Sequence, residues 1–286
     1  MRSKLFSRLF FTLATTLVAL ALQVHSATPP LTLRWADNYL TIEGADLPGR
    51  QMKILYLEAY CRPHSQTNNW NNTVIGHQTR LVSASPDGTR IQLQCTLKDG
   101  VVVDHVITAK KDEVDFRLTA RNPTTVVSDA HWGQPCIRVG DFTGLGDPRK
   151  AGTYDYLKKS FVFQKGELVR MPTPDWATSA VYTPGQVWGA PGVPRQDLNP
   201  RPVNPNTPSS GLIGCFSKDE KKVFATAFEP YQELFQGVIT CLHSDFRIGG
   251  LKPGQTRKIR GKIYLVPNDI PALLKRYRHD FPEHAR

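Results

Sequence analysis

The strongest constraint on the fold is a long series of short segments in which apolar and polar residues alternate. Between residues 31 and 139 these segments are separated by turn signals, as where Pro86-Asp87-Gly88 precedes the segment 91–95. Alternation with a period of two is typical of half-buried strands, and strands at this spacing indicate a sandwich or barrel. Similar segments resume after residue 210, and Asn268-Asp269 then predicts the start of one short helix. The sequence therefore predicts an all-β, antiparallel fold with a short C-terminal helix.

The N-terminus predicts an export signal. Three basic residues, Arg2, Lys4 and Arg8, precede an apolar run over residues 9–22 and small residues near position 26. A run this short is typical of a signal peptide, with an uncleaved anchor as the alternative. We therefore expect a signal peptide over residues 1–26 and a single domain over residues 27–286, with no stable membrane span. The expected location is secreted, or in the periplasm or cell envelope.

Charge and cysteine content restrict the partners. The formal net charge is +11, and removal of a leader with three basic and no acidic residues leaves +8. These charges are spread along the chain, so no nucleic-acid partner is expected. The excess favours either attraction to an acidic polysaccharide or simple solubility. The five cysteines form no C-x-x-C pair. Two alternatives stay open for them: disulfides, which an oxidising compartment permits, and buried free thiols.

The composition changes between about residues 140 and 210. Glycine, proline and asparagine gather there, with Trp176, Tyr182 and Trp188 among them. Long irregular segments inside a domain commonly serve a binding site, and large aromatic residues argue against disorder. We expect a loop-rich region that covers a site, or a structural covering loop.

Three histidines stand near predicted strand ends: His77, His131 and His243. A histidine changes charge near neutral pH, so several that converge on one pocket are able to move protons on a sugar. Each histidine alone is more often a structural residue. These three are the candidate catalytic residues.

The surroundings of these histidines resemble the galactose mutarotase (aldose 1-epimerase) superfamily at low similarity over nearly the whole mature chain. The matching segments, in chain order, are Gly76-His77, Asn122-Pro123 with His131-Trp132, and Cys241-Leu242-His243 followed by Leu251-Lys252-Pro253-Gly254. The resemblance implies a galactose mutarotase-like antiparallel supersandwich. It also implies a general acid at His131 and a general base at His243, where the family has a glutamate, with His77 holding the ring oxygen or a hydroxyl.

The function expected from these observations is carbohydrate binding or an epimerase-like or lyase-like reaction, which makes an isomerase or a polysaccharide lyase the enzyme classes to consider. The alternative is a non-catalytic carbohydrate-binding or structural envelope protein, and no cofactor is expected. Polar and aromatic residues near the histidines are the candidate substrate-binding residues: Arg62, Trp132, Gln134, Trp188, Glu229, Tyr231, Glu233, Asp245 and Arg247.

Two other uses of the histidines stay open. His77, His131 and His243, with Asp245, are possible metal ligands, but no H-x-H or H-x-x-E-H spacing supports this, so no metal is assigned. A nucleophilic cysteine paired with a histidine, for example Cys241 with His131, is the other alternative.

Overall fold

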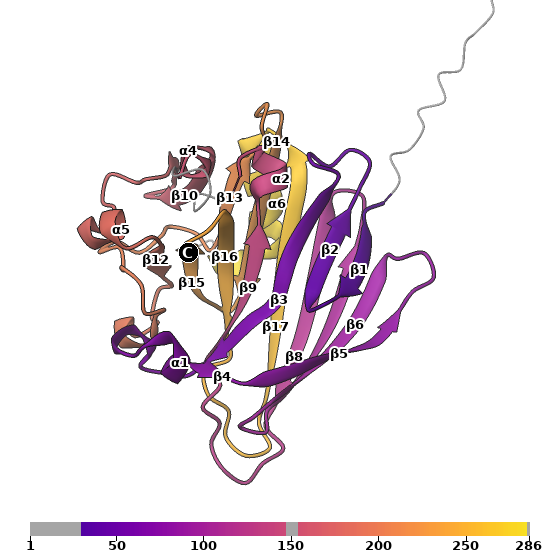
Figure 1. The fold of residues 1–286 in the computed structure, drawn as a ribbon, viewed down its shortest axis with the longest axis vertical. Helices are drawn as coiled ribbons and strands as arrows, with labels where there is room; N and C mark the ends of the chain where they lie inside the picture. The colour runs from indigo at the N-terminus through magenta and orange to yellow at the C-terminus, as the bar shows by residue number, and fades with distance from the viewer. Residues whose placement is uncertain (1–29, 147–153, 285–286) are drawn as a thin grey trace, which may run out of the picture.

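Two antiparallel β-sheets form the body of the computed structural model, which describes residues 30–146 and 154–284 (Figure 1). The predicted leader, residues 1–26, lies outside the described residues. All pairings between the named strands are antiparallel. In the part of the chain that the structure describes, no helix is both long and apolar enough to cross a membrane.

We call the eight-stranded sheet, in which β4 pairs with β3 beside the main path, sheet A. Its strand order is β1 (Thr32–Ala36), β2 (Tyr39–Glu43), β3 (Gln51–Cys61), β9 (Trp132–Arg138), β16 (Cys241–Arg247), β15 (Tyr231–Gln236) and β12 (Gln186–Gly189), with β4 (Val74–Ile75) at the side.

The nine-stranded sheet is sheet B. Its order is β11 (Glu167–Arg170), β10 (Ser160–Gln164), β13 (Ile213–Phe216), β14 (Lys222–Glu229), β17 (Thr256–Pro267), β8 (Glu113–Arg121), β7 (Val102–Ala109), β6 (Arg90–Leu97) and β5 (His77–Ala84). The two sheets together confirm the predicted all-β antiparallel fold class.

The main hydrophobic core lies between the sheets and follows from the alternation in the sequence. On β8, Phe116 and Leu118 belong to this core, whereas Arg117 between them is exposed. On β16, Leu242 and Phe246 point into the same core. The alternating residues of β16 therefore lie on the outer face of sheet A, which is where the candidate site forms.

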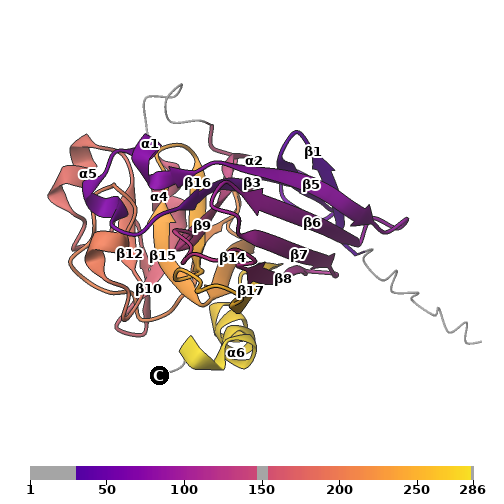
Figure 2. The same cartoon turned by 90° about the horizontal axis from the view of Figure 1, so that it is seen from below.

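A second apolar cluster joins the outer face of sheet B to α6 (Ile270–Asp280), the predicted C-terminal helix. Figure 2 shows this helix outside the sheet, beside β14 and β17. Asp269 caps the helix, because its carboxylate accepts a hydrogen bond of 2.9 Å from the Ala272 amide. Leu273 and Tyr277 are its buried residues and pack on the sheet. The expectation of one short terminal helix is confirmed.

The region 140–210 is more regular than its composition suggests. It contributes β10, β11 and β12, because apolar residues such as Phe161 and Phe163 satisfy strand periodicity between the loops. Among its described residues, the short helices are α2 (Gly140–Thr143), α4 (Tyr156–Lys159), α5 (Thr178–Tyr182) and the 3₁₀ turn η2 (Arg195–Asp197). The remaining short helices are η1 (Ser65–Thr67), α1 (Trp70–Thr73) and η3 (Pro282–His284). Both views show α1, α4 and α5 at the end of the molecule where β12, β15 and β16 lie (Figures 1 and 2).

Candidate functional site

A cavity of about 350 Å³ lies on the outer face of sheet A, and we call it the sheet A cleft. Its floor comes from β9 and β16, which are neighbours in the sheet. The segment around η2 covers it: the Asn199 amide donates a 3.0 Å hydrogen bond to Glu233, and the Gln66 side chain from η1 donates to the Arg201 carbonyl. Part of the 140–210 region thus borders the cleft, as expected for a covering segment.

His243 is the candidate histidine that lines this cleft. Its imidazole is 1% exposed, and Nε2 lies 3.2 Å from the Cys241 sulfur. Nδ1 faces Asp245 with 3.8 Å between Nδ1 and Oδ1, and has no hydrogen-bond partner among the described residues. The two ring nitrogens therefore face protein groups, a thiol on one side and a carboxyl group on the other.

The other two histidines lie in different surroundings. His77 borders a separate cavity of about 550 Å³, and its ring centroid is 5.0 Å from that of Tyr60. His131 is half-buried, with Nδ1 3.9 Å from Asp197, and lines neither cavity. Burial lowers the pKa of both histidines. Neither of these two cavities is lined by all three imidazoles, and Glu58 is the residue shared by the His77 and His243 cavities.

Of the candidate substrate-binding residues, Gln134 lines the sheet A cleft. Its side-chain oxygen is buried and has no hydrogen-bond partner among the residues that the structure describes. Such an orphaned acceptor is costly unless a ligand or solvent molecule donates to it. Gln134 is thus a buried polar residue at the cleft whose acceptor oxygen has no partner among the described residues.

Trp132 and Trp188 are both 0% exposed. Trp188 packs against Trp176 with 5.7 Å between ring centroids, and Trp132 packs with Cys61 and Ala59. Both candidate indoles are therefore covered by protein, and neither lines the sheet A cleft. Trp70, which is 38% exposed, is the tryptophan at the cleft.

Four further candidates are engaged by protein groups away from the cleft lining. Arg62 donates to the Val74 carbonyl at 2.6 Å, and Arg247 donates to the Gln232 amide oxygen at 2.5 Å. Glu229 and Tyr231 contact His284, which lies in η3 after the last helix. Their polar groups are used to hold the fold together.

Glu233 and Asp245 form a buried cross-strand pair beneath the covering segment. Burial raises the pKa of Glu233 to about 8 and the pKa of Asp245 well above its ordinary value. Two buried carboxyl groups this close cannot both ionise cheaply, so the pair retains a proton at neutral pH. Asp245 also lies behind His243, as described above.

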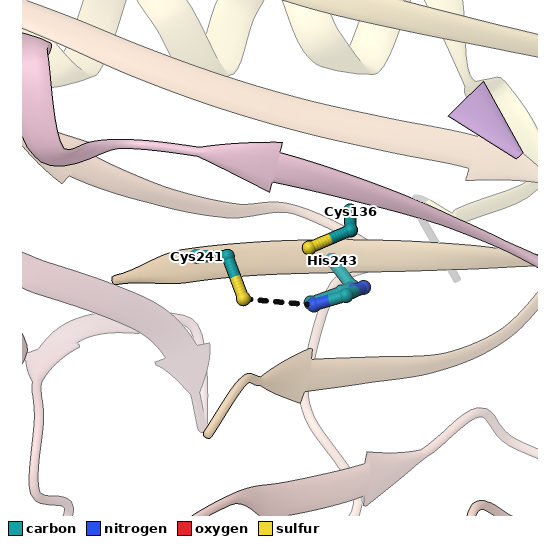
Figure 3. Close-up of side chains that lie close together, drawn as sticks. All are labelled: Cys136, Cys241 and His243. Atoms are coloured by element: carbon teal, nitrogen blue, oxygen red, sulfur yellow. Dashed lines mark hydrogen bonds between the residues drawn. The ribbon is translucent and has the colours of Figure 1, made fainter. Parts of the chain in front are cut away.

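A pair of thiols, Cys136 and Cys241, lies beside His243 at the cleft (Figure 3). The sulfurs of Cys136 and Cys241 and a ring nitrogen of His243 all lie within 4.8 Å of one another. Burial raises the pKa of the Cys136 thiol. It opposes ionisation of Cys241 too, but hydrogen bonding to Cys136 and the nearby His243 outweigh it and hold the Cys241 pKa well below the usual value.

The thiol cluster was missed in the sequence, although a signal for it exists. All five cysteines are described and all are buried free thiols, so the disulfide alternative is not realised in this structure. Cys241, His243 and Asp245 alternate along one strand, and a period of two places them on the same face. Cys136 joins them only through the pairing of β9 with β16, which a single sequence does not reveal. The histidine beside Cys241 is therefore His243 and not His131.

Comparison with known proteins gives a match at the level of structure. No family model and no curated protein matches the chain. Slr1438 from Synechocystis sp. PCC 6803 matches with 10% identity and a TM-score of 0.44, over 84% of this chain and 96% of that one. A putative aldose 1-epimerase from Escherichia coli K12 matches with 10% identity and a TM-score of 0.40, over 82% and 98%.

A galactose mutarotase-like protein from Lactobacillus casei ATCC 334 matches with 8% identity and a TM-score of 0.41, over 82% of this chain and 99% of that one.

Proposed function

We propose that the protein is an exported carbohydrate-binding protein that holds an acidic sugar in the sheet A cleft. The observation that supports this proposal is a set of polar groups at the cleft with no described partner. Arg138 and Arg201 line the cleft, and neither guanidinium has a hydrogen bond or ion pair within the described residues. Burial lowers the pKa of Arg138, but the nearby Cys136, Cys241 and Glu58 outweigh burial and raise it, so Arg201 is the arginine without such neighbours in the described part of the chain. The orphaned oxygen of Gln134 lies in the same cleft.

These groups match the chemistry of a uronic acid. A guanidinium group donates two parallel hydrogen bonds to a carboxylate, and an amide oxygen accepts from a hydroxyl. The exposed face of Trp70 offers a surface for the C–H side of a pyranose ring. A volume of about 350 Å³ is at the small end of the range for ligand sites, which favours one end of a glycan over a long chain segment.

Binding is favoured over turnover by the state of the histidines. An epimerase-like or lyase-like reaction needs both an acid and a base at the sugar. His131 and His77 lie outside the cleft, and both ring nitrogens of His243 face protein groups. Glu58 is the carboxylate that lines the cleft, and the other groups there that exchange protons, the Cys136 and Cys241 thiols, are buried beside His243.

Titration calorimetry of the mature chain with galacturonate, glucuronate and their neutral counterparts tests the proposal. We expect binding of the acidic sugars and a loss of about tenfold or more in affinity in Arg201→Gln, since a hydrogen bond to a charged group contributes roughly 1.5–3 kcal/mol. Arg90→Gln changes an exposed arginine on sheet B and is the matched control. Equal affinity for acidic and neutral sugars, an unaffected Arg201→Gln protein, or sugar turnover by the wild type would contradict the proposal.

A further inference from the structure

We propose that Cys136, Cys241 and His243 bind a zinc ion at the floor of the sheet A cleft. The three side chains are 1%, 2% and 1% exposed, and their sulfur and nitrogen atoms lie within 4.8 Å of one another. Two thiols and an imidazole are the donor set that zinc prefers over hard cations. This inference does not depend on the sugar proposal.

The spacing of the donor atoms suits a single ion. Zinc lies about 2.3 Å from thiolate sulfur and about 2.0 Å from imidazole nitrogen, so ligand atoms around one tetrahedral ion are roughly 3.3–3.8 Å apart. The observed 3.2 Å between the Cys241 sulfur and His243 Nε2 is close to this range. Figure 3 shows the three side chains pointing toward one another from adjacent strands. All three separations are at most 4.8 Å, and any that exceed the tetrahedral range would have to shorten when the ion binds.

The orientation of His243 provides a second observation. Nε2 faces the thiols, while Nδ1 faces Asp245 at 3.8 Å and has no hydrogen-bond partner among the described residues. Histidines that bind zinc commonly donate the proton of their other nitrogen to a carboxylate, which fixes the ring and its tautomer. Asp245 is therefore the positioning residue for His243, and Nε2 carries the lone pair for the ion.

The arrangement leaves one position of a tetrahedral ion facing the cleft. All three ligands line the cavity, so the fourth ligand comes from solvent or from the molecule that the cleft holds. Three protein ligands beside an open cavity distinguish this site from the closed four-ligand sites that only support a fold. An ion here would be accessible to exchange and to chelators.

Cobalt substitution provides a direct test on the reduced mature chain. Co²⁺ added to the wild type is expected to give a thiolate-to-cobalt charge-transfer band at one ion per chain, and Zn²⁺ is expected to remove it. Cys136→Ala and Cys241→Ala should each lose about half of the band, and His243→Ala should bind more weakly while keeping the thiolate absorption. Cys215→Ala removes a buried free thiol outside the site and is the matched control.

A second kind of variant, which changes Asp245 behind His243 and none of the three ligands, keeps the test decisive if a ligand variant does not fold. Asp245→Asn retains the three ligands and is expected to weaken zinc binding by about 10–100-fold. The proposal is overturned if reduced wild type takes up neither ion, or if the Cys136→Ala/Cys241→Ala double variant gives the wild-type band. It is also overturned if Cys136 and Cys241 form a disulfide whose reduction does not produce metal binding. The readout needs no sugar, so it is independent of the calorimetry above.

Discussion

At the level of single residues, burial determines what each titratable group can do, and His105 shows this most clearly. It lies between the two sheets, 1% exposed, with Nδ1 2.8 Å from the Tyr56 hydroxyl and Nε2 3.1 Å from the Tyr60 hydroxyl. Burial lowers its pKa to about 3. The neutral imidazole is thus part of the core and has no role in the cleft.

This burial predicts a loss of stability in mild acid. In the unfolded chain His105 takes up a proton near its ordinary pKa of about 6.5, whereas in the folded chain it does so only near pH 3. The contribution of the neutral His105 to the free energy of unfolding is therefore complete above about pH 6.5 and decreases as the pH falls from there toward 3. By pH 5 the decrease is roughly 2 kcal/mol. His105→Gln should lower stability at pH 7 but show a smaller further decrease at pH 5, measured by urea unfolding at both pH values. If the free energy of unfolding of His105→Gln decreases from pH 7 to pH 5 by as much as that of the wild type, His105 is excluded as a source of acid sensitivity.

The site shows where residue-level prediction from the sequence succeeds and where it stops. His243, Gln134 and Asp245 were identified as candidates, and all three lie at or directly behind the cleft. His77 and His131 were grouped with them because each follows a similar local pattern, but only the sheet pairing determines which residues meet. Arg201 was missed, because nothing local in a proline-rich loop indicates which strand it will cover.

At the level of elements, α6 was predicted well because its signals are local: a capping Asp269, a proline in the first turn and an apolar stripe. The sequence predicts a loop-rich region over residues 140–210, but the structure has three strands in the described part of this region. Its glycine and proline content concealed β10 to β12, which are only four or five residues long and gain stability from neighbouring strands. Short strands of this kind depend on tertiary contacts more than on their own composition.

Packing of α6 on sheet B predicts a graded response to mutation. Leu273 is 2% exposed within the cluster that includes Phe161 and Tyr264, so Leu273→Ala should lower the free energy of unfolding by about 2–5 kcal/mol. Lys275→Ala changes an exposed residue of the same helix and should have an effect within about 0.5 kcal/mol. Denaturant unfolding followed by circular dichroism measures both. A Leu273→Ala protein as stable as Lys275→Ala would show that the helix does not depend on this contact.

At the level of the whole molecule, the strand order ties distant parts of the chain into each sheet. In sheet A, β9 lies between β3 and β16, so residues near 55, 136 and 242 are neighbours. In sheet B, β17 lies between β8 and β14. The sequence indicated a sandwich because periodicity is local, but this order depends on contacts across more than half the chain and could not be read from it. The thiol pair of Cys136 and Cys241 is a product of that long-range order.

Interleaving of this kind predicts that the described body unfolds as one cooperative unit. Within residues 30–146 and 154–284, neither the N-terminal nor the C-terminal part has a sheet of its own, and one core cluster includes Leu33 from β1 and Ile263 from β17. Far-ultraviolet circular dichroism and tryptophan fluorescence should therefore give coincident thermal transitions. His105→Gln, in the main core, and Leu273→Ala, on the outer face of sheet B, should each move this single transition to lower temperature. A separate early transition in Leu273→Ala would instead show that α6 and its cluster unfold independently of the sandwich.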